Sequence, residues 1–317
     1  MLAPMPTFTL REVRAVCKER DAWWTVLLVD PYAIRLTRWL ASRTSVTPAQ
    51  LTVAAFALGL GAAGCFAQGT PGWLALGALL YHVGFVVDCC DGKLARLKGL
   101  GSPFGAWLDF MLDRVRDGVC ALALAHGLHT QTGRTAYWVM GCAVLALDMV
   151  RYLNGAQLAK ARRMIRRRQR EKALAAMASA ASAVSPASAG GVAVVPRTRP
   201  AADGLPVPPP QAPAAVPQSD DPAGRGGDPG RPGAAYARVR AFLLRHRIRM
   251  HLVSGIEFQM AVFVVGPLTG LVLPAVAVAG ALLLAFEAAL IVTFWRRARR
   301  TAAAPAAPRT PAPAPAA

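Results

Sequence analysis

The chain has 317 residues, with 36 Lys and Arg residues against 17 Asp and Glu residues, which gives a formal net charge of +19 at pH 7. Hydrophobic residues nevertheless make up 54% of the chain and charged residues only 17%, with a mean hydropathy of +0.36. An ordinary soluble domain does not combine such hydropathy with such concentrated charge, and a nucleic-acid-binding protein has no need of long uncharged apolar runs. We therefore expect a membrane protein with basic cytoplasmic segments and no nucleic-acid partner.

Residues 1–46 alternate basic and apolar side chains and include Trp23, Trp24 and Trp39. Tryptophan and basic residues both favour the headgroup layer of a bilayer. We predict an amphipathic N-terminal helix that lies at the membrane interface. A helix that packs on the rest of the protein is the alternative.

Six apolar runs follow, each close to the roughly 20 residues that cross a bilayer as a helix. They are approximately residues 48–67, 73–97, 103–127, 134–155, 250–268 and 271–295. Pro48 and Pro103 directly follow Thr47 and Ser102, which is typical of the capped first turn of a helix. The predicted fold is an all-α integral membrane protein with six transmembrane helices and the interfacial N-terminal helix.

Basic residues gather at alternate connections between these runs. Three of them lie at 93–98, many more at 160–172, and four arginines close the last run, whereas the other connections hold at most one. Cytoplasmic connections carry an excess of Lys and Arg. We therefore place both termini on the cytoplasmic side of the membrane, and we expect an integral protein of a bacterial cell membrane.

The composition changes sharply after the fourth apolar run. Residues 173–235 and 301–317 are dominated by Ala, Pro, Ser and Gly, a composition that buries too little apolar surface to fold. The predicted organisation is an amphipathic segment (1–46), the first four transmembrane helices (47–172), a disordered cytoplasmic linker (173–235), the last two transmembrane helices (236–300) and a disordered tail (301–317).

Four aspartates lie inside the second and third apolar runs. Asp88 and Asp91 are three residues apart, and Asp109 and Asp113 are four apart, so each pair shares one face of a helix. With a short connection at 98–102, the two pairs would face each other at similar depth, about 9 to 15 Å from the helix ends. Charges at such a depth line a cavity or bind a partner, near the cytoplasmic face in this topology.

Facing carboxylates repel one another unless cations bind between them. Ligands that are all oxygen atoms suit Mg²⁺ or Mn²⁺, and two such ions can hold a phosphoryl group during a displacement reaction. Gly92 and Gly105 leave room for a ligand, and Arg96 could meet its phosphates. The simpler explanations are close helix packing for the glycines and membrane topology for Arg96.

The stretch from Asp88 to Asp113 resembles the signature of the CDP-alcohol phosphotransferases, also called CDP-alcohol phosphatidyltransferases. That signature reads D-x2-D-G-x2-A-R-x8-G-x3-D-x3-D. Its eight fixed positions are all filled, by Asp88, Asp91, Gly92, Ala95, Arg96, Gly105, Asp109 and Asp113. The resemblance extends in weaker form over about 30–160 and the last two apolar runs.

The resemblance implies a role for each of these residues. It implies that two divalent cations, Mg²⁺ or Mn²⁺, are held by Asp88, Asp91, Asp109 and Asp113, with Asp113 also the general base for the acceptor hydroxyl. It implies that Gly92, Ala95, Arg96 and Gly105 contact the CDP part of the donor. Pro48 is a further candidate for such contacts, since Thr47–Thr52 resembles the family's Thr-Pro-Asn-x-x-Thr with Ala49 in place of Asn. Ser102, just before the third apolar run, is another.

The residues around Asp113 resemble one branch of the family. Leu108–Gly118 matches Leu-Asp-x3-Asp-Arg-x2-Asp-Gly, which is found in the inositol-phosphate branch, including phosphatidylinositol phosphate synthases and di-inositol phosphate phosphate synthases. The acceptors of that branch carry a phosphate, so basic residues are needed to bind it. The candidates are Arg114, Arg116 and Arg151. Asp117 and Asp148 could instead neutralise Arg114 and Arg151 as structural pairs.

We therefore predict a metal-dependent enzyme of phospholipid biosynthesis. It would transfer a phosphatidyl group from a CDP-linked donor such as CDP-diacylglycerol to a polar alcohol such as an inositol phosphate, with release of CMP. Membrane lipid is a further expected partner, and the resemblance suggests a homodimer. The alternative is a divalent-cation or proton transporter, since carboxylates inside a membrane also mark ion pathways. The clustering of all four aspartates near one face, beside Arg96 and two glycines, favours the transferase.

Overall fold

The structure is a computed structural model that describes residues 7–183, 234–249 and 254–302. The described residues form helices and connections, with a single isolated bridge between Asp21 and Ile248 and no strand. The predicted all-α class is therefore confirmed for these residues.

The helices follow one another along the chain with short connections between α3 and α6. They are α1 (Leu10–Ala15), α2 (Asp30–Arg43), α3 (Pro48–Gln68), α4 (Pro71–Lys98), α5 (Pro103–Thr132), α6 (Ala136–Ala183), α7 (Ala234–Arg245), α8 (Gly255–Met260), α9 (Gly266–Thr269) and α10 (Val272–Ala302). Two stretches are π-helical. The first, η1 (Thr25–Val29), leads into α2, and the second, η2 (Ala261–Val265), joins α8 to α9.

Four of the described helices, α3, α4, α6 and α10, are long and apolar enough to cross a membrane. The third predicted span corresponds to α5, which has 30 residues but carries five charged side chains between 109 and 117. The fifth corresponds to Gly255–Thr269, an apolar but shorter helical stretch. The structure thus supports four of the six predicted spans by length and composition, and the other two stay predictions.

The local signals that start α3 and α5 act as predicted. Thr47 caps α3 at Pro48, with a reciprocal pair of hydrogen bonds between Thr47 and Gln50. Ser102 caps α5 at Pro103, where its Oγ accepts a hydrogen bond from the Gly105 backbone N–H at 2.9 Å. These caps satisfy backbone donors that have no partner within the helix, and they set the length of the α4–α5 connection.

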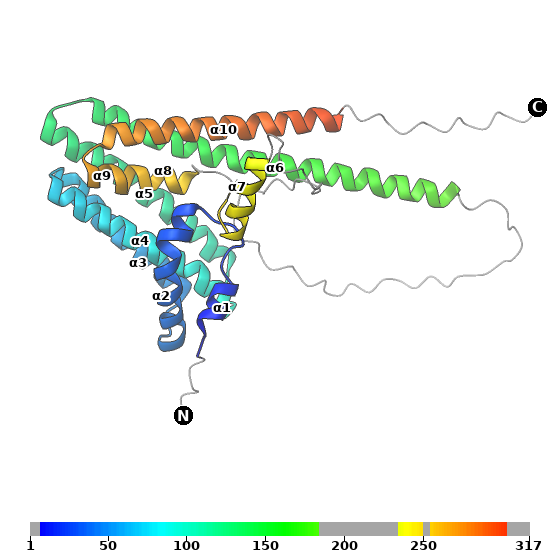
Figure 1. The fold of residues 1–317 in the computed structure, drawn as a ribbon, viewed down its shortest axis with the longest axis horizontal. Coiled ribbons are helices and arrows are strands. Elements are labelled where there is room, and N and C mark those ends of the chain that lie inside the picture. Colours follow the sequence, from blue (N-terminus) through cyan, green and yellow to red (C-terminus); the bar gives the residue numbers. More distant parts are fainter. Residues whose placement is uncertain (1–6, 184–233, 250–253, 303–317) are drawn as a thin grey trace, which may run out of the picture.

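The core lies where α3, α4, α5 and η2 meet. Helix α3 packs against both α4 and α5 (Figure 1). Phe66, Tyr81 and Phe263 are fully buried, and the Phe263 ring centroid lies 4.7 Å from that of Tyr81 and 6.3 Å from that of Phe66. A ring from the last third of the chain therefore closes the α3–α4 hairpin, which fixes η2 beside the signature helices.

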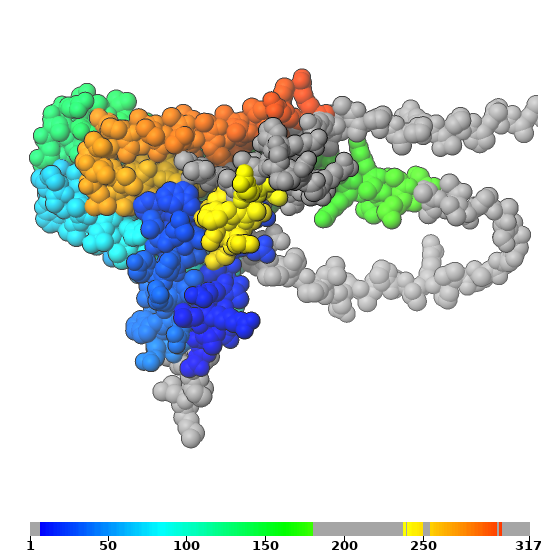
Figure 2. All heavy atoms as spheres, viewed as in Figure 1, coloured from blue at the N-terminus to red at the C-terminus, as the bar shows by residue number. Residues whose placement is uncertain are grey.

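Helix α6 is much longer than a membrane span. It continues past the end of α10, which packs beside it (Figure 1), and its C-terminal part projects from the body of the molecule (Figure 2). Residues 173–183, which we predicted to begin the disordered linker, are helical and continue α6. The rest of that predicted linker up to 233, and the tail from 303, lie outside the described residues.

The N-terminal segment contains two helical pieces where one continuous helix was predicted. Thr9 and Glu12 form a capping box at the start of α1. Bonds from the Thr9 backbone N–H and hydroxyl hold the pKa of Glu12 below its ordinary value. After α1 the chain bends, and the Asp21 backbone bonds both Arg247 and Arg249. This long-range pairing lies in the break between the helical pieces, while the location of the segment at a membrane interface stays a prediction.

Candidate active site

The predicted aspartate cluster forms at the α4–α5 hairpin. One carboxylate oxygen from each of Asp88, Asp91 and Asp109 lies within 4.8 Å of the others. Gly99 ends α4 in the left-handed conformation at φ 66°, which glycine adopts without strain, and the chain then turns directly into α5. Three of the four predicted cation ligands are therefore close enough to share one ion.

Asp113 lies one turn further along α5, and it borders the cluster through an arginine. Its Oδ1 is 2.9 Å from Arg116 Nη2, and Arg116 Nη1 is 3.9 Å from Asp88 Oδ1. Asp113 is not part of the group of three within 4.8 Å. Arg116 itself is almost fully buried, with 3% of its surface exposed. Arg116, which we predicted to bind the acceptor, thus pairs with the carboxylates of Asp88 and Asp113.

Helix α3 contributes a hydroxyl to the cluster. Thr52 Oγ1 donates a hydrogen bond to Asp91 Oδ2 at 2.5 Å, and both residues are buried. Sequence reasoning noted Thr52 only as the last residue of the segment that resembles Thr-Pro-Asn-x-x-Thr. That resemblance was the only hint in the sequence that Thr52 belongs to the site. The Thr52–Asp91 contact joins two helices, so no local spacing of residues predicts it.

The residues predicted to contact the donor lie at the ends of α3, α4 and α5 that face the cytoplasm in the predicted topology. Arg96 is exposed, its Nε donates to Val16 O at 2.7 Å, and a Cβ on Gly92 would lie 3.3 Å from Arg96 Nη1. Ala95 is half-buried beside them. Ser102 uses its hydroxyl to cap α5 against Gly105, and Pro48 opens α3. Their contacts with a donor stay predictions.

The predicted acceptor arginines differ in how they are paired. Arg114 Nη1 lies 2.6 Å from Asp148 Oδ2 and its Nη2 lies 3.0 Å from Asp117 Oδ2, with the guanidinium 3.9 Å from the centre of the Tyr152 ring. Arg114 therefore forms structural ion pairs with Asp117 and Asp148, which was the alternative to acceptor binding for this residue. Arg151 also lies over Tyr152, at 4.9 Å, but Asp148 pairs with Arg114 instead.

Arg151 retains an unsatisfied donor. Its Nη1 is buried and has no hydrogen-bond partner among the described residues. A Cβ on Gly255, at the start of α8, would overlap the Arg151 guanidinium, so the absence of a side chain at Gly255 makes room for it. An unpaired buried cationic donor is costly unless a ligand completes it.

Asp117 joins four donors into one buried network, of which the sequence suggested only the pairing with Arg114. Its Oδ1 accepts from Tyr81 Oη at 2.8 Å and from Arg116 Nε at 3.3 Å. Its Oδ2 accepts from Gln259 Nε2 at 2.5 Å and pairs with Arg114. A further signal was Gln259, a polar residue inside the fifth predicted apolar run. The network connects α4, α5 and α8 directly behind the aspartate cluster.

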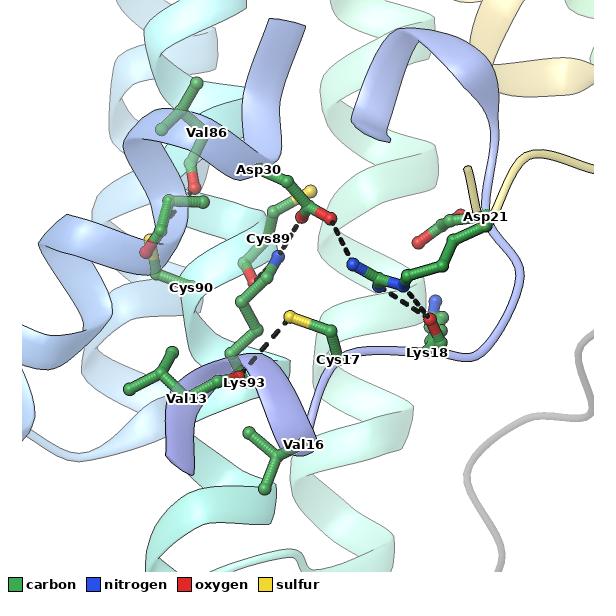
Figure 3. A network of polar contacts seen from close by, with 12 residues as sticks. Val13, Val16, Cys17, Lys18, Asp21, Asp30, Val86, Cys89, Cys90 and Lys93 are labelled. Carbon is green, nitrogen blue, oxygen red and sulfur yellow. Dashed lines mark hydrogen bonds and ion pairs between the residues drawn. The ribbon is translucent and has the colours of Figure 1, made fainter. Parts of the chain in front are cut away.

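A second network ties the N-terminal segment to α4 (Figure 3). Lys93 is buried, and its Nζ lies 3.0 Å from Asp30 Oδ1 and donates to Cys89 O at 3.1 Å. The other oxygen of Asp30 is 3.4 Å from Arg247 Nη1, and Arg247 also bonds the Lys18 carbonyl. Lys93, which follows Gly92 in the signature, therefore connects α4 to Asp30 at the start of α2.

The fold and the site define an all-α membrane protein with a carboxylate cluster suited to hard divalent cations. Residues 45–195 match the family model described as CDP-alcohol phosphatidyltransferase. Residues 45–195 therefore form a CDP-alcohol phosphatidyltransferase domain, which confirms the resemblance of the signature to that family.

Curated relatives point to the same family. The chain is 39% identical over 93 residues to a bifunctional IPC transferase and DIPP synthase of Rubrobacter xylanophilus, covering 29% of this chain and 21% of that protein. It is 38% identical over 92 residues to a phosphatidylinositol phosphate synthase of Corynebacterium glutamicum, covering 29% and 39%. It is 36% identical over 93 residues to an archaetidylinositol phosphate synthase of Pyrococcus horikoshii, covering 29% and 47%. The chain thus spans less than half the length of each of these relatives.

Proposed function

We propose that this protein transfers a phosphatidyl group from CDP-diacylglycerol to a hydroxyl of an inositol phosphate and releases CMP. The observation that carries the proposal is the group of Asp88, Asp91 and Asp109 within 4.8 Å, built from the family signature. The names of two relatives, a phosphatidylinositol phosphate synthase and an archaetidylinositol phosphate synthase, support the choice of acceptor.

The donor set fits hard divalent cations. Every side chain of the cluster offers carboxylate oxygens, no sulfur or nitrogen ligand belongs to the group of three, and oxygen ligands are those that Mg²⁺ and Mn²⁺ prefer. We assign one cation to Asp88, Asp91 and Asp109, and a second to the side of Asp88 and Asp113. Bound there, two such ions would neutralise the donor's pyrophosphate and the leaving CMP.

The residues of the chain divide the chemistry between them. Asp113 takes the proton from the acceptor hydroxyl, using the carboxylate whose Oδ1 is already fixed by Arg116. The acceptor oxygen then forms a bond to the phosphorus that carries the diacylglycerol. The bond from that phosphorus to the bridging oxygen breaks, and CMP leaves with the electron pair. Arg96, exposed above Gly92, binds the pyrophosphate and so holds the reacting phosphorus near Asp113.

Arg151 is the best placed of the three arginines to bind the phosphate of the acceptor. Arg114 and Arg116 already pair with carboxylates, whereas Arg151 forms no ion pair among the described residues and its buried Nη1 has no hydrogen-bond partner there. A phosphate oxygen would satisfy this donor by a charge-assisted hydrogen bond. The predicted topology puts this site on the cytoplasmic side, where soluble inositol phosphates and CMP exchange with water.

The test uses the purified full chain in lipid nanodiscs with labelled CDP-diacylglycerol, Mg²⁺ and a panel of acceptors. The panel holds inositol phosphate, free inositol, glycerol phosphate and serine. We expect CMP release with inositol phosphate, its loss in excess chelator, and its loss in Asp91→Asn. The matched control is Arg167→Gln, which alters an exposed residue paired with Glu171 on α6.

Two results would contradict the proposal. If no acceptor in the panel supports CMP release, the proposed transferase activity is refuted. Preference for an unphosphorylated acceptor would refute the assignment of the substrate. Vesicles that show cation flux dependent on Asp91, without CMP release, would favour the transporter instead.

A further inference from the structure

Arg116 is a buried cation placed directly beside the aspartate cluster. Its Nη2 lies 2.9 Å from Asp113 Oδ1 and its Nη1 lies 3.9 Å from Asp88 Oδ1. Asp88 therefore belongs both to the group of three aspartates and to this ion pair. The signature leaves the position of Arg116 outside its fixed residues.

The surrounding helices are shaped to hold Arg116 in this position. A Cβ on Gly59 of α3 would overlap Cγ and Cδ of Arg116, so the aliphatic stem passes α3 where no side chain is present. Its Nε lies 3.3 Å from Asp117 Oδ1, and Tyr81 and Gln259 fix Asp117 in turn. A buried arginine held on three sides keeps its orientation without a ligand.

The cluster consequently has two unlike halves. Among the described residues, neither Asp91 nor Asp109 forms an ion pair with a basic side chain, so a cation can enter there without displacing one. The half formed by Asp88 and Asp113 already contains the Arg116 guanidinium. A divalent cation placed there would lie within a few ångström of a fixed positive charge, which repels it.

We propose that the fixed charge of Arg116 weakens binding of the second divalent cation at Asp88 and Asp113, so that the two cation positions fill in order. The inference rests on the proposed function, under which the four aspartates bind two cations. The first binds at Asp88, Asp91 and Asp109. The second binds only when a CDP pyrophosphate adds negative charge that offsets the repulsion between the ion and the Arg116 guanidinium. The complete cation pair then exists only when the donor is present.

The test counts the Mn²⁺ ions bound per chain, by calorimetry and by the spin resonance of free Mn²⁺, on purified full chain in nanodiscs. We expect the wild type to bind one ion alone and two in the presence of CDP. Arg116→Gln should bind two without CDP, with the second site at least roughly tenfold tighter than in the wild type. Arg116→Lys retains the charge and should keep the wild-type pattern.

Arg114→Gln is the matched control. It removes a neighbouring arginine that pairs with Asp117 and Asp148 and with none of the four cluster aspartates, and it should leave the cation count unchanged. Thermal melting of each variant with and without Mn²⁺ verifies that the protein is folded. If Arg116→Gln does not fold, the wild type and Arg116→Lys decide the question through their dependence on CDP.

Several outcomes overturn the inference. They are two tight sites in the wild type without CDP, a second-site affinity in Arg116→Gln within about twofold of the wild type, or equal tightening in Arg114→Gln. A wild-type protein that binds no Mn²⁺ in any state contradicts the proposed function itself, so the two failures are distinguishable.

Discussion

The hydroxyl of Thr52 on α3 donates a hydrogen bond to Asp91 Oδ2 on α4 at 2.5 Å, across 39 positions of sequence. Both side chains are buried, and Asp91 is the most enclosed of the three clustered aspartates. Partners in the outer shell of a metal site orient the ligand carboxylates and raise the affinity for the ion. Thr52 is therefore a positioning residue for the proposed first cation.

Thr52→Val keeps the shape of the side chain but removes the hydroxyl donor. We expect the affinity for Mn²⁺ to fall about tenfold, the lower end for losing such a partner. Titration calorimetry on nanodisc-embedded protein gives the constant. The control is Thr132→Val. The hydroxyl of Thr132 donates to the Leu128 carbonyl near the C-terminal end of α5, away from the aspartate cluster. Equal losses in both variants would show that the effect is not specific to Asp91.

Asp113→Asn and Asp91→Asn should fail in different ways. Asp113→Asn retains an oxygen but loses the proton acceptor, so CMP release should fall by roughly 10²-fold or more while CDP binding largely survives. Asp91→Asn should lose cation affinity, and CDP binding with it. Turnover and equilibrium binding of CDP are measured on the same preparations. Near-normal turnover in Asp113→Asn would remove this residue from the role of base.

Arg151→Gln tests the proposed contact with the acceptor phosphate. Loss of one charge-assisted hydrogen bond corresponds to about 1.5–3 kcal/mol, so the KM for inositol phosphate should rise by roughly 10- to 100-fold. The KM for CDP-diacylglycerol should not change. Initial rates over both substrate concentrations separate the two effects. A larger change for the donor than for the acceptor would assign Arg151 to the other substrate.

Gly59→Ala tests the room made for the arginine beside the cluster. The added methyl group would overlap Cγ and Cδ of Arg116, and overpacking of this kind costs about 1–3 kcal/mol. Gly64→Ala on the same helix meets nothing within 4 Å and should be neutral or slightly stabilising, since alanine favours a helix. Thermal melting in one lipid composition compares them. Identical melting temperatures would contradict the packing described for Arg116.

Asp30→Ala tests the anchor between α2 and the signature helix. It leaves Lys93 buried without its carboxylate partner, a loss of about 3–5 kcal/mol for a buried pair. Adding Lys93→Met removes the unpaired charge and should restore part of that stability. The melting temperatures of the single and double variants provide the comparison. A double variant less stable than Asp30→Ala would show that Lys93 is held by other contacts.

Much of the fold could be predicted because its signals are local. Thr47 and Ser102 start α3 and α5 where their capping chemistry placed them, and the apolar runs predicted the long helices. The single N-terminal helix was wrong in form because Asp21 pairs with the backbone at Arg247 and Arg249. The start of the linker was wrong by the residues up to Ala183, since an alanine-rich stretch continues a helix readily.

The sequence by itself determined the carboxylate cluster. Spacings of three and four residues place side chains on one helix face whatever the rest of the chain does, and a short hairpin then brings Asp88 and Asp91 against Asp109. The tertiary structure alone decided which charges surround it. Gln259 reaches Asp117 across 142 positions, and Arg247 reaches Asp30 across 217. No local period encodes such pairs, because they arise only when separate helices pack together and buried charges must find partners.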